Sequence, residues 1–207
     1  MPSLPVVVDL GANHGDFRAA FAGHFKAGRY IAVEANPKLA EALRADPAGE
    51  VVNCAVAPSN EPVRFRIEKN SQASRVSETN DADTVQIQGR TLASIMEEKR
   101  VDRVDLLKVD IEGAELSMIL DAPPATLRRI MQITIEFHDF CNLYPPDQVR
   151  QMVERLRSSG FVAIRFSRDN TNWCFVRRDA PAASPVRIMI AKHITANLRR
   201  LKHFWIR

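Results

Sequence analysis

The chain has 207 residues, 45% of them hydrophobic, and can therefore bury one good core. It contains no apolar run of the roughly eighteen residues that a membrane-spanning helix needs, and its first residues lack the charged and apolar regions of a signal peptide. These absences predict a cytoplasmic protein. The three cysteines are widely separated, which argues against a disulfide framework or a zinc cluster.

The net charge of +4 is unevenly distributed along the chain. Six of the 29 basic residues follow Asp179, and no acidic residue does. The other 23 basic residues are outnumbered by 25 acidic ones. We therefore expect one domain over residues 1–180 and a basic tail over residues 181–207.

Apolar runs alternate with segments of helical periodicity in the predicted domain. This order predicts an α/β fold, a mostly parallel sheet with helices on both faces. Residues 63–67 and 84–88 instead alternate apolar and polar side chains, which predicts a two-stranded antiparallel flap. The predicted strands of the sheet are residues 6–10, 30–33, 51–56, 104–109, 130–137, 161–166 and 173–176, and the predicted helices are residues 16–26, 37–45, 92–99, 115–120 and 146–158.

Residues 7–15, VVDLGANHG, lead from an apolar strand into a turn with a glycine at each end. Gly11 and Gly15 lack a Cβ, so the backbone can turn tightly and a ligand can approach closely. The spacing is G-x-x-x-G, without the middle glycine that makes room for a pyrophosphate in the dinucleotide fingerprint. Glu34 ends the next apolar run, where a carboxylate would accept ribose hydroxyls. The pattern favours a cofactor with a ribose but no pyrophosphate, such as S-adenosylmethionine, over a plain strand–helix connection.

Charged residues end two later strands of the predicted sheet. Period-two geometry places Lys108, Asp110 and Glu112 on one side of an extended chain. Glu136 and His138 share a face at the end of the following strand. Burial of such groups is costly unless they pair with each other, with a metal or with a substrate. If the two strands are neighbours, the three carboxylates and the imidazole converge at one edge of the sheet.

This convergence has two functional interpretations and one structural alternative. An imidazole, or a carboxylate with a raised pKa, can take a proton from a hydroxyl as a general base. Asp110, Glu112, Glu136 and His138 would also suit Mg²⁺ or Mn²⁺. The structural alternative is a salt-bridged strand end in which Lys108 neutralises its neighbours. We favour a functional origin, and general-base catalysis over metal binding.

Four segments together resemble the FkbM family of S-adenosylmethionine-dependent methyltransferases: residues 8–15, 33–37, 53–56 and 108–115. The most specific of them contains the block V-D-x-E-G-x-E at residues 109–115. The resemblance implies a Rossmann-like class I methyltransferase fold with a seven-stranded sheet. It also implies methyl transfer to a hydroxyl of a sugar, a glycan or a polyketide-like small molecule.

The resemblance also assigns candidate site residues by motif. The cofactor would be bound by Asp9, Gly11, Asn13, Gly15, Glu34, Asn53, Ala55 and Asp110. Asp110 and Glu112 would face the reacting centre. We add Glu136 and His138 as catalytic candidates from their spacing, and the same four residues as candidate metal ligands.

The end of the chain combines basic and apolar residues. Residues 186–207 place apolar side chains at helical spacing among six cations, which predicts an amphipathic basic helix. Such a helix can lie on an anionic membrane surface, or pack on the domain or on a second subunit of a homo-oligomer.

A nucleic-acid methyltransferase is less favoured, because the domain is acidic and only 7% of the residues are aromatic. A catalytically inactive cofactor-binding protein is the remaining alternative.

Overall fold

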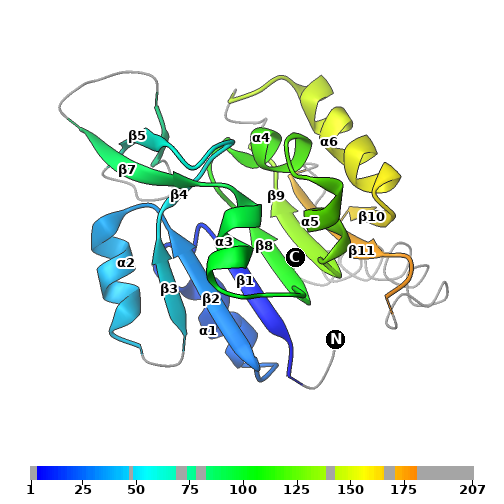
Figure 1. Ribbon diagram of the computed structural model, residues 1–207, viewed down its shortest axis with the longest axis horizontal. Helices are drawn as coiled ribbons and strands as arrows, with labels where there is room; N and C mark the ends of the chain where they lie inside the picture. The colour runs from blue at the N-terminus through cyan, green and yellow to red at the C-terminus, as the bar shows by residue number, and fades with distance from the viewer. Residues whose placement is uncertain are drawn as a thin grey trace, which may run out of the picture.

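The computed structural model describes residues 4–46, 49–68, 74–77, 83–138, 143–165 and 171–180 (Figure 1). Helices and strands alternate along most of the chain, as the sequence predicts. The elements are β1 (Val6–Leu10), α1 (Asp16–Ala22), β2 (Arg29–Glu34), α2 (Pro37–Arg44), β3 (Glu50–Asn53), β4 (Ala55–Val56), β5 (Pro62–Arg66), β6 (Arg75–Val76), β7 (Thr84–Arg90), α3 (Leu92–Glu98), β8 (Leu106–Val109), α4 (Glu115–Leu120), α5 (Pro124–Arg128), β9 (Gln132–Glu136), α6 (Pro146–Ser158), β10 (Phe161–Arg165) and β11 (Asn172–Arg177).

The main sheet has seven strands in the order β10-β11-β9-β8-β1-β2-β3. β1 pairs in parallel with β2 and β8, as do β2 with β3 and β8 with β9, whereas β11 runs antiparallel to both of its neighbours. The predicted Rossmann-like, mostly parallel sheet is therefore confirmed. The chain adds strands on one side of β1 first and then on the other, so the strand order reverses between β1 and β8. Open α/β sheets bind ligands outside the carboxyl ends of the strands at such a reversal.

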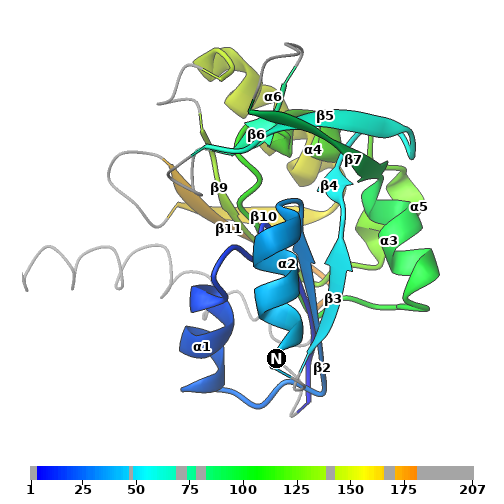
Figure 2. The same cartoon turned by 90° about the vertical axis from the view of Figure 1, so that its left-hand side faces the viewer.

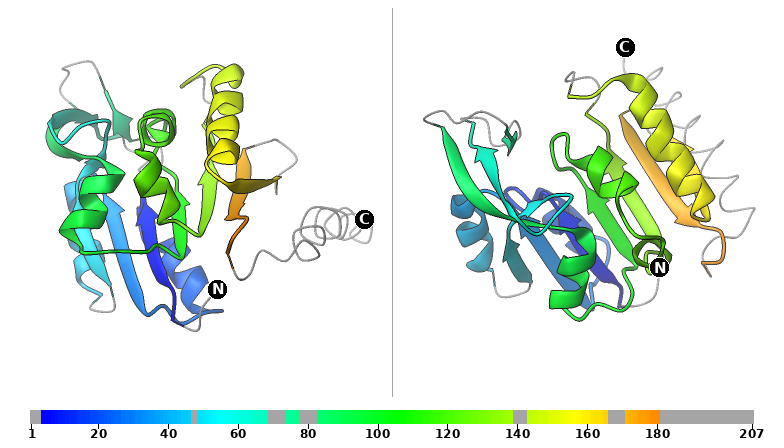
Figure 3. Two further views of the ribbon diagram at one scale, coloured as in Figure 1. Left: turned by 45° about the vertical axis from the view of Figure 1, so that its right-hand side comes forward. Right: turned by 45° about the horizontal axis from the view of Figure 1, so that its top comes forward.

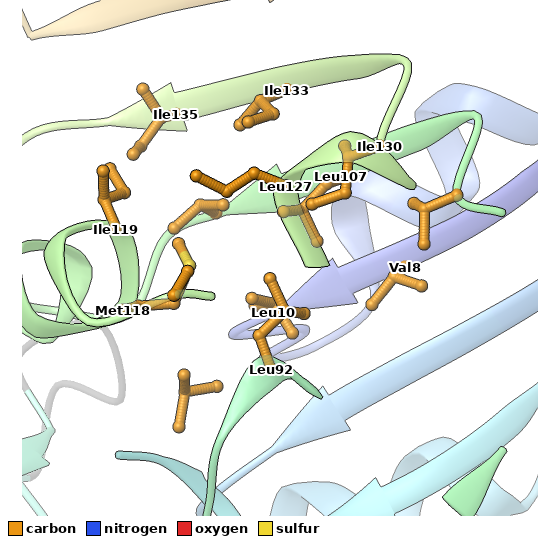
Figure 4. Close-up of a cluster of buried hydrophobic side chains, with 14 of the residues drawn as sticks. Val8, Leu10, Leu92, Leu107, Met118, Ile119, Leu127, Ile130, Ile133 and Ile135 are labelled. Carbon is orange, nitrogen blue, oxygen red and sulfur yellow. The ribbon is translucent and has the colours of Figure 1, made fainter. Parts of the chain in front are cut away.

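Helices cover both faces of this sheet (Figure 2). The larger apolar cluster packs α3, α4, α5 and α6 against one face. Figure 4 shows part of it, where Val8, Leu10 and Leu107 of the strands lie beside side chains of the helices. A smaller cluster on the other face joins Phe21 of α1 and Leu43 of α2 to the strands. Each fully buried aliphatic side chain stabilises the fold by about 1.5–3 kcal/mol, so the sheet is a rigid base for the loops at its edge.

Local sequence signals explain where several helices begin and end. The Asn36 side chain caps α2 by accepting the N–H of Lys38 at 3.0 Å, and Pro37 occupies the first turn, where its missing N–H has no cost. Helix α1 is shorter than predicted: it ends at Ala22 with Gly23 as its C-cap, and Phe25 beyond it is 55% exposed. Helix α5 was not predicted, because a five-residue helix spans too few turns to show a periodic pattern.

A second, smaller sheet lies over the carboxyl edge of the main sheet (Figure 2). β5 and β7 pair antiparallel at the positions of the expected flap, and β6 and β4 extend them to four strands. The strand predicted over residues 51–56 is divided at Cys54: β3 belongs to the main sheet, and β4 to the flap. Figure 3 shows the flap and α6 on opposite sides of α4.

None of the helices in the described ranges is long and apolar enough to cross a membrane. The predicted basic tail, residues 181–207, lies outside the described residues. Its expected membrane or subunit contacts therefore stay predictions.

Candidate active site

A cavity of about 780 Å³ opens at the carboxyl edge of the main sheet, beneath the flap. Its wall combines the turn after β1, the end of β2, strand β4 with the residue before it, and the ends of β8 and β9 with residues that follow them. The flap adds Phe65 and the strand β6. The volume lies within the range of about 300–1,000 Å³ that is typical of ligand pockets. The cavity therefore occupies the position that the strand reversal predicts.

The turn after β1 requires glycine at position 11. Gly11 has a φ of +75°, and a Cβ placed on it would lie 1.8 Å from the carbonyl oxygen of Asp110. The N–H groups of Gly11 and Ala12 both donate to the carbonyl oxygen of Val33, at 2.9 and 3.1 Å. Lys108 Nζ donates to the carbonyl oxygen of Gly11 at 2.5 Å. The turn is thus fixed against β2 and β8 at the mouth of the cavity.

Glu34 lies at the end of β2 with its carboxylate in the cavity wall. Its Oε2 accepts the N–H of Asn13 at 2.8 Å, and its Oε1 accepts the N–H of Asn36 at 2.7 Å. Burial raises the pKa of Glu34, and the two backbone hydrogen bonds oppose this rise. Each carboxylate oxygen can accept a second donor, so Glu34 can bind a pair of hydroxyls.

Five of the eight predicted cofactor residues line the cavity: Gly11, Asn13, Glu34, Ala55 and Asp110. The other three, Asp9, Gly15 and Asn53, lie behind the wall and support it. Asp9 is fully buried and accepts the hydroxyl of Tyr30 at 2.6 Å, while Lys108 Nζ lies 3.2 Å from its Oδ1.

Gly15 and Asn53 hold backbone in place. Gly15 has a φ of +85° and caps the start of α1. Asn53 Nδ2 donates to the carbonyl oxygens of Glu34 and Ala35, at 2.8 and 3.1 Å. Asp9, Gly15 and Asn53 thus contact other parts of the protein around the cavity, and the direct cofactor contacts predicted for them stay predictions.

The predicted convergence of charged residues is present, because β8 and β9 are parallel neighbours. Asp110, Glu112, Glu136 and His138 all line the cavity. His138 Nε2 lies 3.5 Å from Asp110 Oδ1 and 3.4 Å from Glu112 Oε2.

The geometry of Glu112 differs from the prediction. β8 ends at Val109, and the chain then turns through left-handed conformations, with a φ of +50° at Glu112 and +99° at Gly113. The chain is therefore not extended as far as Glu112, and the predicted period-two alignment of Glu112 with Lys108 and Asp110 is absent. The turn brings it to the same cavity instead.

His138 is surrounded by carboxylates. Its Nδ1 lies 2.9 Å from Glu115 Oε1, and carboxylates accept rather than donate hydrogen bonds, so this nitrogen carries a proton. Burial lowers the pKa of His138, but hydrogen bonds and charges from Glu112 and Glu115 outweigh it and raise the pKa to about 11. These contacts favour the protonated ring at neutral pH. A general base needs the neutral ring, so the arrangement disfavours the catalytic role predicted for His138, which stays a prediction.

The environment of the Glu136 carboxylate differs from that of His138. It is half-buried, and within the described ranges its carboxylate has no hydrogen bond and no ion pair closer than 4.0 Å. Burial raises the pKa of Glu136, and the negative charge of Asp110 raises it further, against the opposing charge of His138. Glu136 therefore presents a carboxylate of increased basicity to the cavity.

Three of the four predicted metal ligands form a compact group in the described part of the chain. One ligand atom each from Asp110, Glu112 and His138 lies within 4.8 Å of the other two. Glu136 is not part of this group. A metal ion here would need the Nε2 lone pair of His138, which a proton occupies when the ring is charged.

Sequence reasoning missed Glu115 as a site residue. Its side chain is fully buried, and it accepts hydrogen bonds from the turn after β8 and from His138. A signal was present, because Glu115 is the last residue of the V-D-x-E-G-x-E block and begins a helix whose other inward positions are apolar.

Residues 9–163 match the family described as the methyltransferase FkbM domain. The chain belongs to the FkbM methyltransferase family. The matched region contains every residue of the cavity wall that precedes β11. The family assignment and the seven-stranded sheet agree with the sequence-based resemblance.

Solved structures resemble this FkbM chain in fold. The methyltransferase FkbM from Methylobacillus flagellatus has a TM-score of 0.55 and 18% identity, over 84% of this chain and 44% of that one. An O-methyltransferase from Bacillus cereus, solved in complex with SAH, has a TM-score of 0.51 and 12% identity, over 84% of this chain and 75% of that one.

A curated relative matches a smaller part of the chain. The AMB antimetabolite synthetase AmbE of Pseudomonas aeruginosa is 34% identical over 77 residues, which are 37% of this chain and 4% of the synthetase. The chain thus spans less than half the length of both this synthetase and the Methylobacillus enzyme.

Proposed function

We propose that the protein is an S-adenosylmethionine-dependent O-methyltransferase. Its acceptor is a hydroxyl of a sugar, a glycan or a polyketide-like small molecule. The observation that carries the proposal is the pairing of Glu34 and Glu136 in one cavity: the first can bind a ribose, and the second can take a proton from an acceptor.

The side chains of the cavity fit this cofactor. Cys54, Ala55, Val56 and Phe65 offer an apolar wall for an adenine beside Glu34. Glu34 would hold the ribose hydroxyls, and the Gly11 turn with Asp110 would hold the positively charged amino-acid end. S-adenosylmethionine supplies an electrophilic methyl group when it is bound. The family assignment and the SAH bound to the Bacillus cereus enzyme support the same cofactor.

The residues at the ends of β8 and β9 would perform the acceptor chemistry. Methyl transfer would form an O–CH3 bond on the acceptor and break the S–CH3 bond of the donor, with SAH as the leaving group. The Glu136 carboxylate would take the proton of the acceptor hydroxyl, so that no free alkoxide has to form in water. The His138 imidazolium holds Asp110 and Glu112 in position and reduces their repulsion of Glu136. The protein otherwise contributes by aligning the acceptor oxygen with the methyl group.

The charge of the wall favours a neutral, hydroxyl-rich acceptor over a nucleic acid. Its carboxylates are Asp16, Glu34, Asp110, Glu112 and Glu136, against the cations of Arg75, Lys108 and His138. Carboxylates accept hydrogen bonds from several hydroxyls at once, whereas they repel phosphates. A nucleic-acid substrate would therefore have to approach an unfavourable surface.

Calorimetric titration with S-adenosylmethionine and SAH tests the cofactor. We expect binding that weakens by about 10- to 100-fold in Glu34→Gln, because one carboxylate oxygen becomes an amide that cannot accept from a ribose hydroxyl. Glu97→Gln, on the exposed side of α3, is the matched control and should bind like the wild type. Absence of binding to the wild type would overturn the proposal.

An acceptor screen with isotope-labelled methyl donor then tests the reaction. Turnover of hydroxylated sugars or polyketide-like compounds is expected. Binding of the cofactor without turnover of any acceptor class would favour the inactive binding protein, and turnover of RNA or DNA alone would favour a nucleic-acid methyltransferase.

Metal-assisted deprotonation is the second candidate, and the 4.8 Å grouping of Asp110, Glu112 and His138 favours it. We nevertheless expect turnover to be unchanged by EDTA, because the protonated His138 already supplies a positive charge between the two carboxylates. Turnover after exhaustive chelation, with and without added Mg²⁺ or Mn²⁺, is the measurement. Loss under EDTA with recovery by either ion would support the metal-assisted reaction instead.

A further inference from the structure

Glu115 connects the two strand ends that carry the acceptor chemistry, although it does not line the cavity. Its Oε1 accepts the N–H of Ile111 at 3.1 Å and lies 2.9 Å from His138 Nδ1. Its Oε2 accepts the N–H of Gly113 at 2.9 Å and the hydroxyl of Tyr144 at 3.4 Å. Four donors thus surround one carboxylate, about as many as its two oxygens can accept.

These contacts close a ring of interactions around His138. The Tyr144 hydroxyl accepts the N–H of His138 at 2.7 Å and donates to Glu115. The backbone and the imidazole of His138 are therefore both tied to the same carboxylate. On the other side, Glu115 holds the left-handed turn through Glu112 and Gly113.

Glu115 contributes to stability by accepting the N–H groups of Ile111 and Gly113, but these two contacts do not require the third one, with His138 Nδ1. Replacing a buried ion pair with apolar side chains of similar volume is often neutral or stabilising. Other side chains of α4, such as Met118 and Ile119, show that the helix can pack here with apolar groups. What an apolar side chain could not do is fix the tautomer and the direction of an imidazole.

We propose that Glu115 is a positioning residue of the methyltransferase: it orients the His138 ring so that Nε2 faces Asp110 and Glu112, and it holds the turn that carries those two carboxylates at the cavity. The inference rests on the proposed function. Glu115 acts on the reaction through His138 and the turn after β8, without touching the acceptor.

Two readouts test this role in Glu115→Gln. The first is the proton signal of His138 Nδ1–H, which a hydrogen bond to a carboxylate shifts to low field and protects from exchange; His138→Gln identifies it. We expect Glu115→Gln to abolish this signal. The second is kinetic: we expect kcat to fall by about 10- to 100-fold, the usual effect of losing an outer partner of an active-site group, with the affinity for SAH within about twofold.

A double variant separates positioning from a general loss of structure. If Glu115 acts through His138, then Glu115→Gln combined with His138→Gln should lower kcat no more than the more damaging single change. If the double variant instead lowers kcat by the product of the two single-variant factors, the proposal is overturned. An unchanged Nδ1–H signal in Glu115→Gln would overturn it as well.

Tyr144→Phe keeps the proposal testable if Glu115→Gln does not fold. It removes one donor to Glu115 without altering a charge, and we expect a shifted Nδ1–H signal with a smaller loss of kcat. An unaltered signal in Tyr144→Phe would then overturn the ring of interactions. If the wild type turns over no acceptor, the proposed function fails, while the proton signal still decides whether Glu115 orients His138.

Discussion

Gly11→Ala is expected to weaken SAH binding by at least about 100-fold and to lower the free energy of unfolding by roughly 3 kcal/mol. Two effects add at this position. The backbone has a φ of +75°, which an L side chain rarely adopts, and the new Cβ would lie 1.8 Å from the carbonyl oxygen of Asp110. Because that oxygen belongs to backbone, no side-chain rotation relieves the overlap, and the turn must move away from β8.

Gly23→Ala is the matched control for this change. Gly23 has a φ of −66°, and a Cβ there would come no closer than 3.5 Å to the carbonyl oxygen of Ala20. Alanine at such a position is tolerated or slightly stabilising. Calorimetry with SAH and chemical denaturation measure both variants, and wild-type affinity in Gly11→Ala would contradict the close packing of the turn on β8.

Glu136→Gln should lower kcat by about 10²- to 10⁴-fold, the usual contribution of a general base. The amide has nearly the same shape as the carboxylate but cannot take a proton. The affinity for SAH should stay within about twofold, because Glu136 is the last residue of β9, whereas Glu34 is the last residue of β2, on the other side of the strand reversal. Glu97→Gln again serves as the control.

The pH dependence gives a second signature of the same base. Burial raises the pKa of Glu136 above its usual value, and the deprotonated form is the active one. The logarithm of kcat/KM should therefore rise with pH with a slope near one below this pKa and level off above it. The slope should disappear in Glu136→Gln. Half or more of the wild-type turnover in that variant would exclude Glu136 as the base.

Much of the fold and part of the site could be predicted from sequence because their signals are local. Apolar runs indicate the strands. Glu34 is the last residue of one strand, and Gly11 directly follows another, so their places in the fold follow from the strand positions. That Asp9 and Asn53 lie behind the cavity wall could not be predicted, because their contacts depend on neighbouring strands. Asp9, for example, lies opposite Lys108 in the parallel pairing of β1 with β8.

The charge of His138 could not be predicted from sequence for the same reason. Its spacing from Glu136 predicted a shared face, but its charge depends on Glu115, which is 23 residues away and reaches it across two strand ends. The left-handed turn at Glu112 also left no periodic pattern. The choice of Glu136 over His138 as the proposed base therefore rests on contacts between segments that are distant in sequence.

The strand reversal between β1 and β8 separates most of the residues proposed to bind the methyl donor from those proposed to act on the acceptor. Gly11, Glu34 and residues 54–56 would hold much of the methyl donor and come from the strands that precede the flap, with Phe65 of the flap and Asp110 after β8 added to them. Glu136 and His138, which would act on the acceptor, lie at the end of β9. We therefore expect substitutions near the end of β9 to change which acceptor is methylated while the contacts of Gly11 and Glu34 with the donor stay intact.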